Sequence, residues 1–438
     1  MNGSLVERLV PCLMLALGTA VAVLGTVPGG ASASAAPPHR LRPEVHTVPG
    51  AKMSLAQAPA GLRAVVRRTL GAPAAAGGAF QQAKLTASDG APGDIFGVSV
   101  AISGSTAVVG ASFKNSNTGA AYVFVRSGAA WSQQAKLTAS DGFSFDRFGA
   151  SVAISGPTAV VGAFGQFSNT GAAYVFVRSG TAWSQQAKLT AADAQEFDNF
   201  GASVAICGLT VVVGADMKHD FVGAAYVFVR SGTAWHQQRK LTAADGKRGS
   251  FGDSVAISGS TVVVGAEAKN FFTGAAYVFV RSGTAWHQQA RLTAADPAKD
   301  SVFGISVAVS GPTVVVGANH LAGSGTGAAY VFVRSGPAWS QQAKLTAPGP
   351  ATIDLFGTSV AILGSAAVVG APGQTSPGAA YVFARSGTAW HRQAKLTASD
   401  GASRDFFGGS VAISRSTAVA GADGNNAATG AAYVYVNV

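Results

Sequence analysis

Short apolar runs alternate with short polar or glycine-containing connections along most of the chain. In the first complete cycle the runs are residues 99–103, 106–111, 120–126 and 131–139. Val, Ile, Tyr, Phe and Thr dominate the first three runs, as is typical of pleated, buried strands. Ser-Gly dipeptides separate the first run from the second and the third from the fourth, which is a hairpin signal. The pattern therefore predicts four antiparallel strands in each cycle.

This cycle recurs seven times, and a Phe-Gly dipeptide marks every copy. The spacings between successive dipeptides are 52, 52, 51, 52, 53 and 51 residues. The seven phenylalanines are Phe96, Phe148, Phe200, Phe251, Phe303, Phe356 and Phe407. A four-stranded unit repeated at this period describes the blade of a β-propeller.

The predicted strands close into a ring. Residues 81–87 have the sequence of a fourth strand with no preceding three, and residues 431–436 form a third strand with no fourth after it. The N-terminal strand can therefore complete the last blade. We predict an all-β fold over residues 80–438, a seven-bladed β-propeller of four-stranded antiparallel blades, closed by the N-terminal strand.

The outer strands carry a basic residue at one repeated position, as protection of an exposed sheet edge requires. These residues are Lys84, Lys136, Lys188, Lys240, Arg291, Lys344 and Lys395.

The segment before the propeller has a different character. Residues 1–35 combine an apolar run at 9–27 with Ala-Ser-Ala sequences, which indicates a secretory signal peptide. The run is long for a signal core, so an uncleaved anchor is the alternative. Residues 36–79 are rich in Ala, Pro and Gly and are interpreted as a linker, with a short amphipathic helix at 62–70.

Composition excludes several classes of protein. The 438 residues include 56 glycines, 48% are hydrophobic and only 12% are charged, which excludes a disordered charged tail and a long coiled coil. The formal net charge is +11. About half of this excess lies before residue 80, so the propeller itself is too mildly basic to indicate nucleic-acid binding.

The blade sequence resembles the FG-GAP repeat, found in the integrin alpha-chain head and in secreted bacterial proteins. Phe-Gly is followed by Val-Val-Gly-Ala and then by Gly-Ala-Ala-Tyr-Val, and one copy reads Gly370-Ala371-Pro372. The resemblance covers residues 80–438 and implies an extracellular propeller with a binding or adhesion role. Integrin-like blades often hold calcium between the first two strands, but here that connection resembles Ser-Gly-Ser-Thr and lacks carboxylates. We therefore expect no cofactor and no calcium at those loops.

Carboxylates recur elsewhere in the cycle and have two interpretations. One Asp follows most fourth strands, and a second often lies two residues before Phe-Gly, as in Asp89 with Asp94 and Asp141 with Asp146. Such pairs can bind a cation, but Asp residues in loops more often accept backbone hydrogen bonds. We expect the structural role, because the alternation of a calcium loop is missing.

No residue is singled out as catalytic. The repeated Ser and Asp residues are present in most blades, whereas a catalytic pair is expected to be unique. No nucleophile elbow, phosphate-binding loop or zinc-protease motif is present. Asp216, His219 and Asp220 form one non-repeated polar cluster, which is either a metal site or a solvated loop.

Variation between the blades predicts where a ligand binds. The Ser-Gly hairpins hardly change, whereas the loops on the opposite face vary and hold unusual aromatic residues. We predict a ligand-binding patch there, and the alternative is that these rings pack between blades. The candidate patch comprises Phe113, Phe164, Phe167, Phe221, Phe271 and Phe272, with Phe143, Phe145 and Phe197 in the neighbouring connections.

These observations lead to one functional expectation. The protein is predicted to be a secreted or cell-surface, non-enzymatic binding or adhesion module and a monomer. Its partner is expected to be a protein or a glycan of the cell wall, with no nucleic acid and no membrane span after signal cleavage. Two alternatives stay open: an extracellular enzyme acting on polysaccharide, which needs unique carboxylates near the central channel, and an envelope component held by its basic rim.

Overall fold

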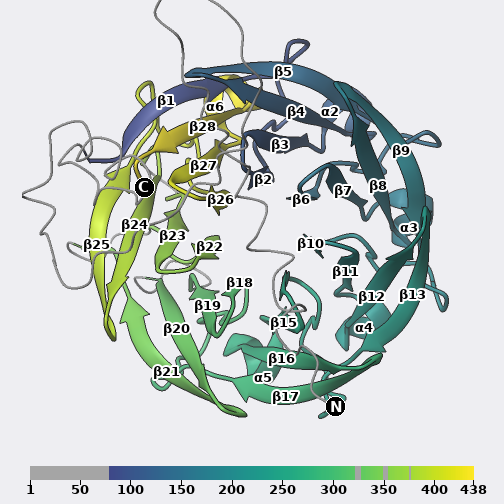
Figure 1. Ribbon diagram of the computed structural model, residues 1–438, viewed down its shortest axis with the longest axis vertical. Helices are drawn as coiled ribbons and strands as arrows, with labels where there is room; N and C mark the ends of the chain where they lie inside the picture. Colours follow the sequence, from purple (N-terminus) through teal and green to yellow (C-terminus); the bar gives the residue numbers. More distant parts are fainter. Residues whose placement is uncertain (1–77, 321–326, 349–353, 374–375) are drawn as a thin grey trace, which may run out of the picture. The chain divides into compact units, whose positions relative to one another are not determined.

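Seven four-stranded antiparallel sheets form a ring around a central channel (Figure 1). The computed structural model describes residues 78–320, 327–348, 354–373 and 376–438. These residues contain 28 strands, β1 to β28, so the predicted seven-bladed, all-β propeller is confirmed. The predicted signal peptide, linker and short helix at 62–70 lie outside the described residues.

Each blade consists of four consecutive strands ordered from the channel to the rim, and the last blade takes its outer strand from the N-terminus. The strands of blades 1 to 4 are β2 (Val100–Ser103), β3 (Thr106–Ala111), β4 (Ala120–Ser127) and β5 (Ala130–Leu137); β6 (Ser151–Ser155), β7 (Thr158–Ala163), β8 (Ala172–Ser179) and β9 (Ala182–Leu189); β10 (Val204–Cys207), β11 (Thr210–Ala215), β12 (Ala224–Ser231) and β13 (Ala234–Leu241); and β14 (Val255–Ser258), β15 (Thr261–Ala266), β16 (Ala275–Ser282) and β17 (Ala285–Leu292).

Blades 5 to 7 follow the same pattern. Their strands are β18 (Ser306–Ser310), β19 (Thr313–Ala318), β20 (Ala328–Ser335) and β21 (Ala338–Leu345); β22 (Val360–Leu363), β23 (Ala366–Ala371), β24 (Ala379–Ser386) and β25 (Ala389–Leu396); and β26 (Val411–Ser414), β27 (Thr417–Ala422), β28 (Ala431–Val436) and β1 (Phe80–Leu85).

The N-terminal strand closes the ring. β1 pairs antiparallel with β28, from Phe80 opposite Val436 to Leu85 opposite Ala432, with an irregularity between Gln81 and Ala83. The side chain of Leu85 is buried in the same hydrophobic cluster as strands of blades 7 and 1. The first and last strands of the propeller are therefore held in one sheet.

The hydrophobic core lies between neighbouring blades. In the first blade, the ring of Phe96 packs edge-on against Tyr122 at 5.5 Å and against Phe124 at 6.0 Å. An equivalent buried aromatic trio recurs in the other six blades, with Tyr435 in place of the second phenylalanine in blade 7. Because each cluster also contains residues of the preceding blade, burial of these rings holds successive blades together.

The Phe-Gly dipeptide is also a point of close backbone approach. A Cβ atom on Gly162 would lie 2.1 Å from the carbonyl oxygen of Gly201 in the following dipeptide, so only glycine fits there. The Oγ atom of Ser151 donates a hydrogen bond of 2.9 Å to the same oxygen. The repeated serine therefore links adjacent blades, which agrees with its exclusion as a nucleophile.

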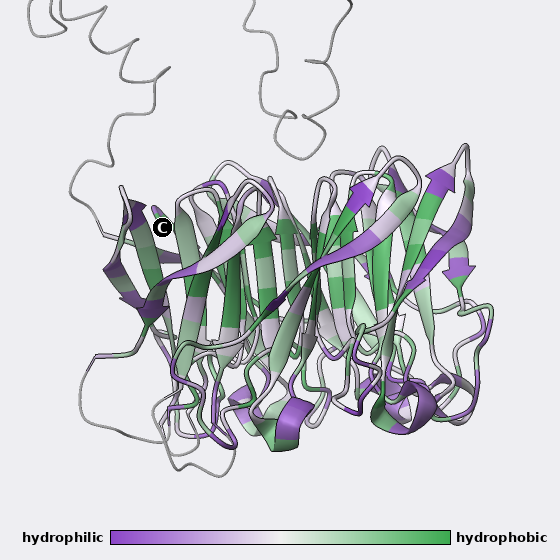
Figure 2. Cartoon of the chain, turned by 90° about the horizontal axis from the view of Figure 1, so that it is seen from below, coloured by the Kyte–Doolittle hydropathy of each residue, from purple (hydrophilic) through white to green (hydrophobic). Residues whose placement is uncertain are grey.

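The connections lie on two opposite faces of the disc (Figure 2). The Ser-Gly hairpins form one face. The other, called the loop face below, holds the connections from the second to the third strand and from the fourth strand to the next blade. On the loop face the described residues form five short turns, α2 (Lys114–Asn117), α3 (Gln166–Asn169), α4 (Lys218–Phe221), α5 (Lys269–Phe272) and α6 (Asn425–Ala428).

These turns have an unusual backbone. In α2, the residues Asn115, Ser116 and Asn117 have φ angles of 50°, 55° and 64°, which place three successive residues in the left-handed region. Residues other than Gly, Asn and Asp are strained in this backbone conformation. The carbonyl groups of Ser116 and Asn117 accept hydrogen bonds from Phe145 and Arg147 of the next connection. Contacts with the following loop therefore compensate for the strained turn.

Candidate functional site

Each turn on the loop face lies beside the carboxylates that the sequence pairs in the connections. The blade-3 arrangement defines what we call a socket: Asp193 and Asp198 in the connection before β10, Lys218 at the start of α4, and Tyr226 and Lys240 on β12 and β13. Lys218 is fully buried, and its Nζ atom lies 2.7 Å from Oδ2 of Asp198. It also donates a hydrogen bond to the carbonyl of Asp193. The ammonium group thus fastens the left-handed turn to the connection beside it.

The outer part of the socket is formed around the first carboxylate. Asp193 accepts hydrogen bonds of 2.7 Å from both Tyr226 and Lys240. Burial alone would raise the pKa of Asp193, but these two bonds and the nearby ammonium groups outweigh burial and hold that pKa at about 2. Burial and the hydrogen bond to Asp193 raise the pKa of Tyr226 far above its usual value, so it stays a phenol donor.

Blades 1 and 4 contain sockets with the same chemistry. In blade 1, the buried Lys114 lies 2.8 Å from Asp94, and Lys136 lies 2.6 Å from Asp89. In blade 4, which lacks the second Asp, Lys269 binds Asp245 at 2.6 Å. The structural interpretation of the Asp pairs is therefore correct in blades 1 and 3: the cation that they bind is a lysine of the chain itself.

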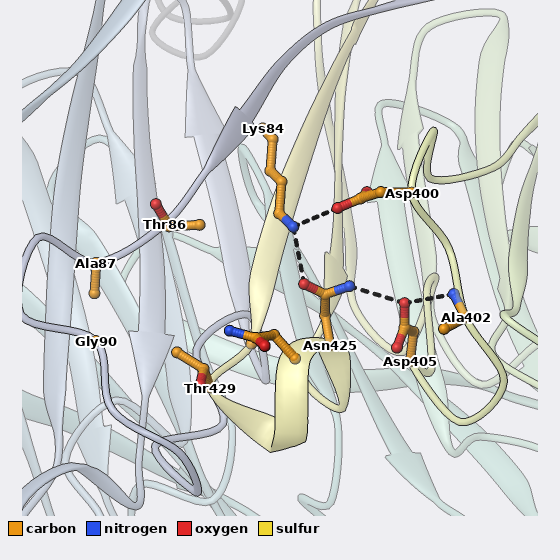
Figure 3. A pocket seen from close by; sticks show the side chains of 11 residues that line it. Lys84, Thr86, Ala87, Gly90, Asp400, Ala402, Asp405, Asn425 and Thr429 are labelled. Carbon is orange, nitrogen blue, oxygen red and sulfur yellow. Dashed lines mark hydrogen bonds and ion pairs between the residues drawn. The ribbon is translucent and has the colours of Figure 1, made fainter.

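Blade 7 replaces the buried lysine with Asn425 (Figure 3). Its amide nitrogen donates to Asp405 at 2.8 Å, and its amide oxygen accepts from Lys84 at 2.9 Å. Lys84 also binds Asp400 at 2.6 Å, which ties β1 to the last blade. The shorter side chain leaves a cavity of about 600 Å³ beside these residues.

Blade 2 has Gln166 at the position of the buried lysine. Its Nε2 atom donates to Asp141 at 3.2 Å, and among the described residues it makes no hydrogen bond to Asp146. Asp146 is only 3% exposed, and a backbone N–H, that of Phe143, donates to it at 2.7 Å. Among the described residues it has no ion pair, and burial raises its pKa above the usual value. A cavity of about 470 Å³ opens beside it.

The basic residues of the rim are mostly neutralised. Six of the seven expected edge residues lie within 4.0 Å of a carboxylate in the adjoining connection; in blade 5, for example, Lys344 lies 2.5 Å from Asp296. The seventh, Lys395, lies over the ring of Tyr381. An attachment to anionic polymer through a free basic rim is therefore weakened as an alternative, because these cations already have partners.

These pairs predict acid sensitivity. A carboxyl group whose pKa is lowered by folding stabilises the fold above its unfolded pKa and ceases to do so as the pH falls through its folded pKa. For Asp193 that window runs from the usual value of 3.8 down to about 2. The pKa values of five equivalent carboxyl groups are also lowered: those of Asp89, Asp141, Asp245, Asp296 and Asp400.

We therefore expect the urea midpoint to fall steeply below about pH 4. The carboxyl groups with raised pKa values, such as Asp146, act in the opposite sense and gain stability as the pH falls toward those values. Urea unfolding followed by tryptophan fluorescence between pH 2 and pH 7 measures the balance, with Asp193→Asn as the control that should lose part of the acid dependence. An unchanged midpoint between pH 4.5 and pH 2.5 would contradict this assignment.

The aromatic residues predicted to form a patch lie on the loop face over blades 1 to 4. Phe271 is 85% exposed, and Phe113, Phe221 and Phe272 are exposed by 40–44%. Phe164 is half-buried, and Arg147 lies between it and Phe113, at 5.1 and 5.5 Å from the two ring centres. The side chain of Phe167 lies outside the described atoms. In the adjoining connections Phe143, Phe145 and Phe197 are also exposed.

The predicted cluster of Asp216, His219 and Asp220 does not form one site. Asp220 pairs with Arg248 on the surface, and His219 lies 3.4 Å from Lys240. Asp216 lies deeper, with its Oδ1 atom buried and no hydrogen-bond partner for that atom in the described part of the chain. No group of three His, Cys, Asp or Glu residues within the described ranges is placed to hold a metal ion.

Asp216 lies instead near two acidic residues of blade 4 that sequence reasoning missed, Asp253 and Glu267. Asp253 is the one charged side chain among the described residues that line the central channel. Burial, followed by repulsion from Glu267 and Asp216, raises the pKa of Asp253 well above its usual value. Asp253 is unique in the alignment of the blades, where it replaces Val98, whereas Asp216 and Glu267 share the position of Ser112, which is also acidic in blade 7 as Asp423. Comparing the blades position by position would have found them.

Comparison with known proteins agrees with the geometry of the blades. The family model described as "FG-GAP repeat" matches seven segments that together span most of the propeller. The matched residues are 80–124, 131–176, 183–228, 235–279, 286–332, 339–383 and 390–435. No curated protein matches the chain. Among the described residues, no helix has the length and apolar character that a membrane crossing requires.

Proposed function

The chain belongs to the FG-GAP repeat family, and from that premise we propose that it is a secreted binding or adhesion module whose loop face docks a protein or a cell-wall glycan. Propellers of this family are typically extracellular and generally non-catalytic. The apolar run and Ala-Ser-Ala sequences before the linker support export.

One observation carries the proposal: exposed phenylalanines occupy strained backbone positions on the loop face. Phe145, Phe197, Phe221, Phe271 and Phe272 have φ angles between 54° and 73° and are 42–85% exposed. An aromatic residue in the left-handed region is unfavourable, and an exposed ring gains little from burial. Strain of this kind is concentrated at functional sites, where binding can compensate for it.

The other blades indicate which residues the fold itself prefers at these positions. Phe271 of blade 4 aligns with Ser116 and Ser168 of blades 1 and 2, and Phe221 of blade 3 aligns with Asn117 and Asn169. These polar residues have the same positive φ angles. Since the turn forms without an aromatic side chain, the phenylalanines contribute to something other than folding.

This comparison supplies the substitutions for a test. Phe271→Ser together with Phe221→Asn introduces the residues of blades 1 and 2, so we expect stability to change by no more than about 1 kcal/mol. We expect retention of the full chain on its ligand to fall at least tenfold, because exposed aromatic side chains dominate docking surfaces. The measurement is co-sedimentation with cell-wall material and insoluble polysaccharides at low and high salt, followed by capture of extracellular proteins.

Leu209→Ser is the matched control, because Leu209 is 59% exposed on a hairpin of the opposite face. We expect the control to bind as the unaltered protein does. Equal loss from both variants, or full retention by the double variant with every ligand found, would contradict docking through the loop face.

A second candidate function is hydrolysis of a polysaccharide, which the trio of Asp216, Asp253 and Glu267 favours. A glycoside hydrolase needs one carboxyl group held protonated beside another that is ionised, and these three acids have raised pKa values and lie in two adjacent blades. Release of reducing sugar from cell-wall polysaccharide, abolished by Asp253→Asn, would support this activity. Its absence with the unaltered chain would leave the binding role alone.

A further inference from the structure

The socket of blade 2 differs from those of blades 1 and 3 in one group. In blades 1 and 3, the second carboxylate accepts a backbone N–H and the ammonium group of a buried lysine. In blade 2, Asp146 accepts the backbone N–H of Phe143, but the lysine is replaced by Gln166. The amide of Gln166 donates to Asp141 instead, so Asp146 has no side-chain donor among the described residues.

Charge follows the same pattern. The sockets of blades 1 and 3 each contain two Asp and two Lys, whereas that of blade 2 contains Asp141, Asp146 and a single cation, Lys188. Lys188 is bound to Asp141 at 2.6 Å, like its counterparts in the other blades. The socket of blade 2 therefore contains one more carboxylate than ammonium groups. A buried carboxylate without a direct ionic partner is costly unless a cation reaches it.

Space for such a cation is present. The cavity of about 470 Å³ is lined by Asp146, Asp141 and Gln166 on its polar side and by Phe143 and Phe145 on its apolar side. The two rings are 77% and 64% exposed, so they border the cavity at the surface of the loop face. Aromatic walls of this kind suit an alkyl chain that ends in a cation.

We propose that the blade-2 socket binds the side-chain ammonium group of a lysine from a partner protein, which takes the place that Lys114 and Lys218 occupy in blades 1 and 3. The ammonium group would bind Asp146, and the methylene groups would lie against Phe143 and Phe145. A lysine fits better than a divalent cation, because Asp141 is already bound by Lys188 and Tyr174. This inference rests on the proposed function, because it assumes that the partner on the loop face is a protein.

The test uses the full chain labelled with ¹⁵N-phenylalanine and the probe N-acetyl-lysine methylamide. The amide of Phe143 reports on the site, because it donates to Asp146. We expect a saturable shift of this signal with the lysine probe and at least tenfold weaker binding of the uncharged analogue N-acetyl-norleucine methylamide. Equal binding of the two probes would overturn the proposal.

Gln166→Lys is the decisive variant, because it supplies the ammonium group from within the chain, as in blades 1 and 3. We expect it to abolish probe binding, whereas Leu209→Ser, on the opposite face, retains it. Asp146→Asn should also abolish binding, and it provides a second test in case Gln166→Lys does not fold. Undiminished binding by Gln166→Lys or by Asp146→Asn would overturn the proposal.

The two proposals fail separately. Phe271→Ser with Phe221→Asn alters neither Asp146 nor the residues that line its cavity, so those variants should bind the lysine probe normally. If the lysine probe binds and the double variant still retains the ligand, the proposal of the aromatic patch is refuted and that of the blade-2 socket is supported. If the lysine probe does not bind but the double variant loses the ligand, only the proposal of the blade-2 socket is refuted.

Discussion

A chain that begins at Thr86, and therefore lacks β1, is expected to lose the closed ring. Without β1, β28 would be the outermost strand of blade 7 and would have an unpaired edge. The buried Leu85 would also be lost from the cluster between blades 7 and 1. The ion pair of Lys84 with Asp400 and the hydrogen bond of 3.1 Å from Trp131 to Gln82 would be lost with it.

The expected loss is large because several interactions disappear together. Burial of one leucine contributes about 1.5–3 kcal/mol, and each net hydrogen bond adds about 1 kcal/mol, so the sum exceeds ~4 kcal/mol. A free edge strand also promotes association between molecules. Differential scanning calorimetry and light scattering should show a melting temperature lowered by about 5 °C or more, together with aggregation.

The matched control is a chain that begins at Gly78 and retains β1. It should melt as the full chain does, so that the effect is assigned to the strand and not to the residues before it. Addition of a peptide of residues 78–86 to the shorter chain should restore part of the lost stability. Equal melting temperatures for the two shortened chains would show that β1 does not hold the ring.

The blade architecture could be predicted from the sequence because it is repeated. Seven copies of the same four-strand pattern outweigh the ambiguity of any single apolar run, and the incomplete first and last copies predict the closing strand. The start of β1 at Phe80 and its partner β28 agree with that expectation. The aromatic trios follow from the same repetition.

The left-handed turns could not be predicted in the same way. Lys114-Asn115-Ser116-Asn117 contains no glycine and no helical periodicity, and its backbone is fixed by hydrogen bonds to the connection that begins about 30 residues later. The neutralised rim has a similar origin. Lys136 and Asp89 are 47 residues apart, and the connection into blade 1 brings Asp89 within 2.6 Å of the outer strand of that blade.

The sockets were predictable in part. The Asp pairs were recognised as structural, but their partner was missed, although a lysine begins the short turn of the variable loop in blades 1, 3 and 4. An ammonium group in an exposed loop is usually solvated, so its complete burial in blade 3 depends on the fold around Lys218. The exceptions in blades 2 and 7 become informative only once that burial is known.

Lys218→Met is the second substitution with a large expected effect. Methionine fills a similar volume, so the change removes the charge and its hydrogen bonds while leaving the packing largely intact. Asp198, itself buried, would then keep only the N–H of Gln195 as a donor, and the carbonyl of Asp193 would lose its ammonium partner. Breaking a buried ion pair in this way costs about 3–5 kcal/mol.

Two further variants separate the ion pair from the loss of the side chain. Lys218→Met combined with Asp198→Asn removes both charges and should recover at least half of the lost stability, because no uncompensated charge stays buried. Lys240→Met removes an ammonium group that is partly exposed, and it should cost no more than about 1 kcal/mol. The free energy of unfolding of each variant can be measured in urea at pH 7. If Lys218→Met and Lys240→Met lowered the free energy of unfolding by equally small amounts, the buried lysines would not stabilise the sockets. The argument that Asp146 of blade 2 binds an ammonium group from a partner would then lose its basis.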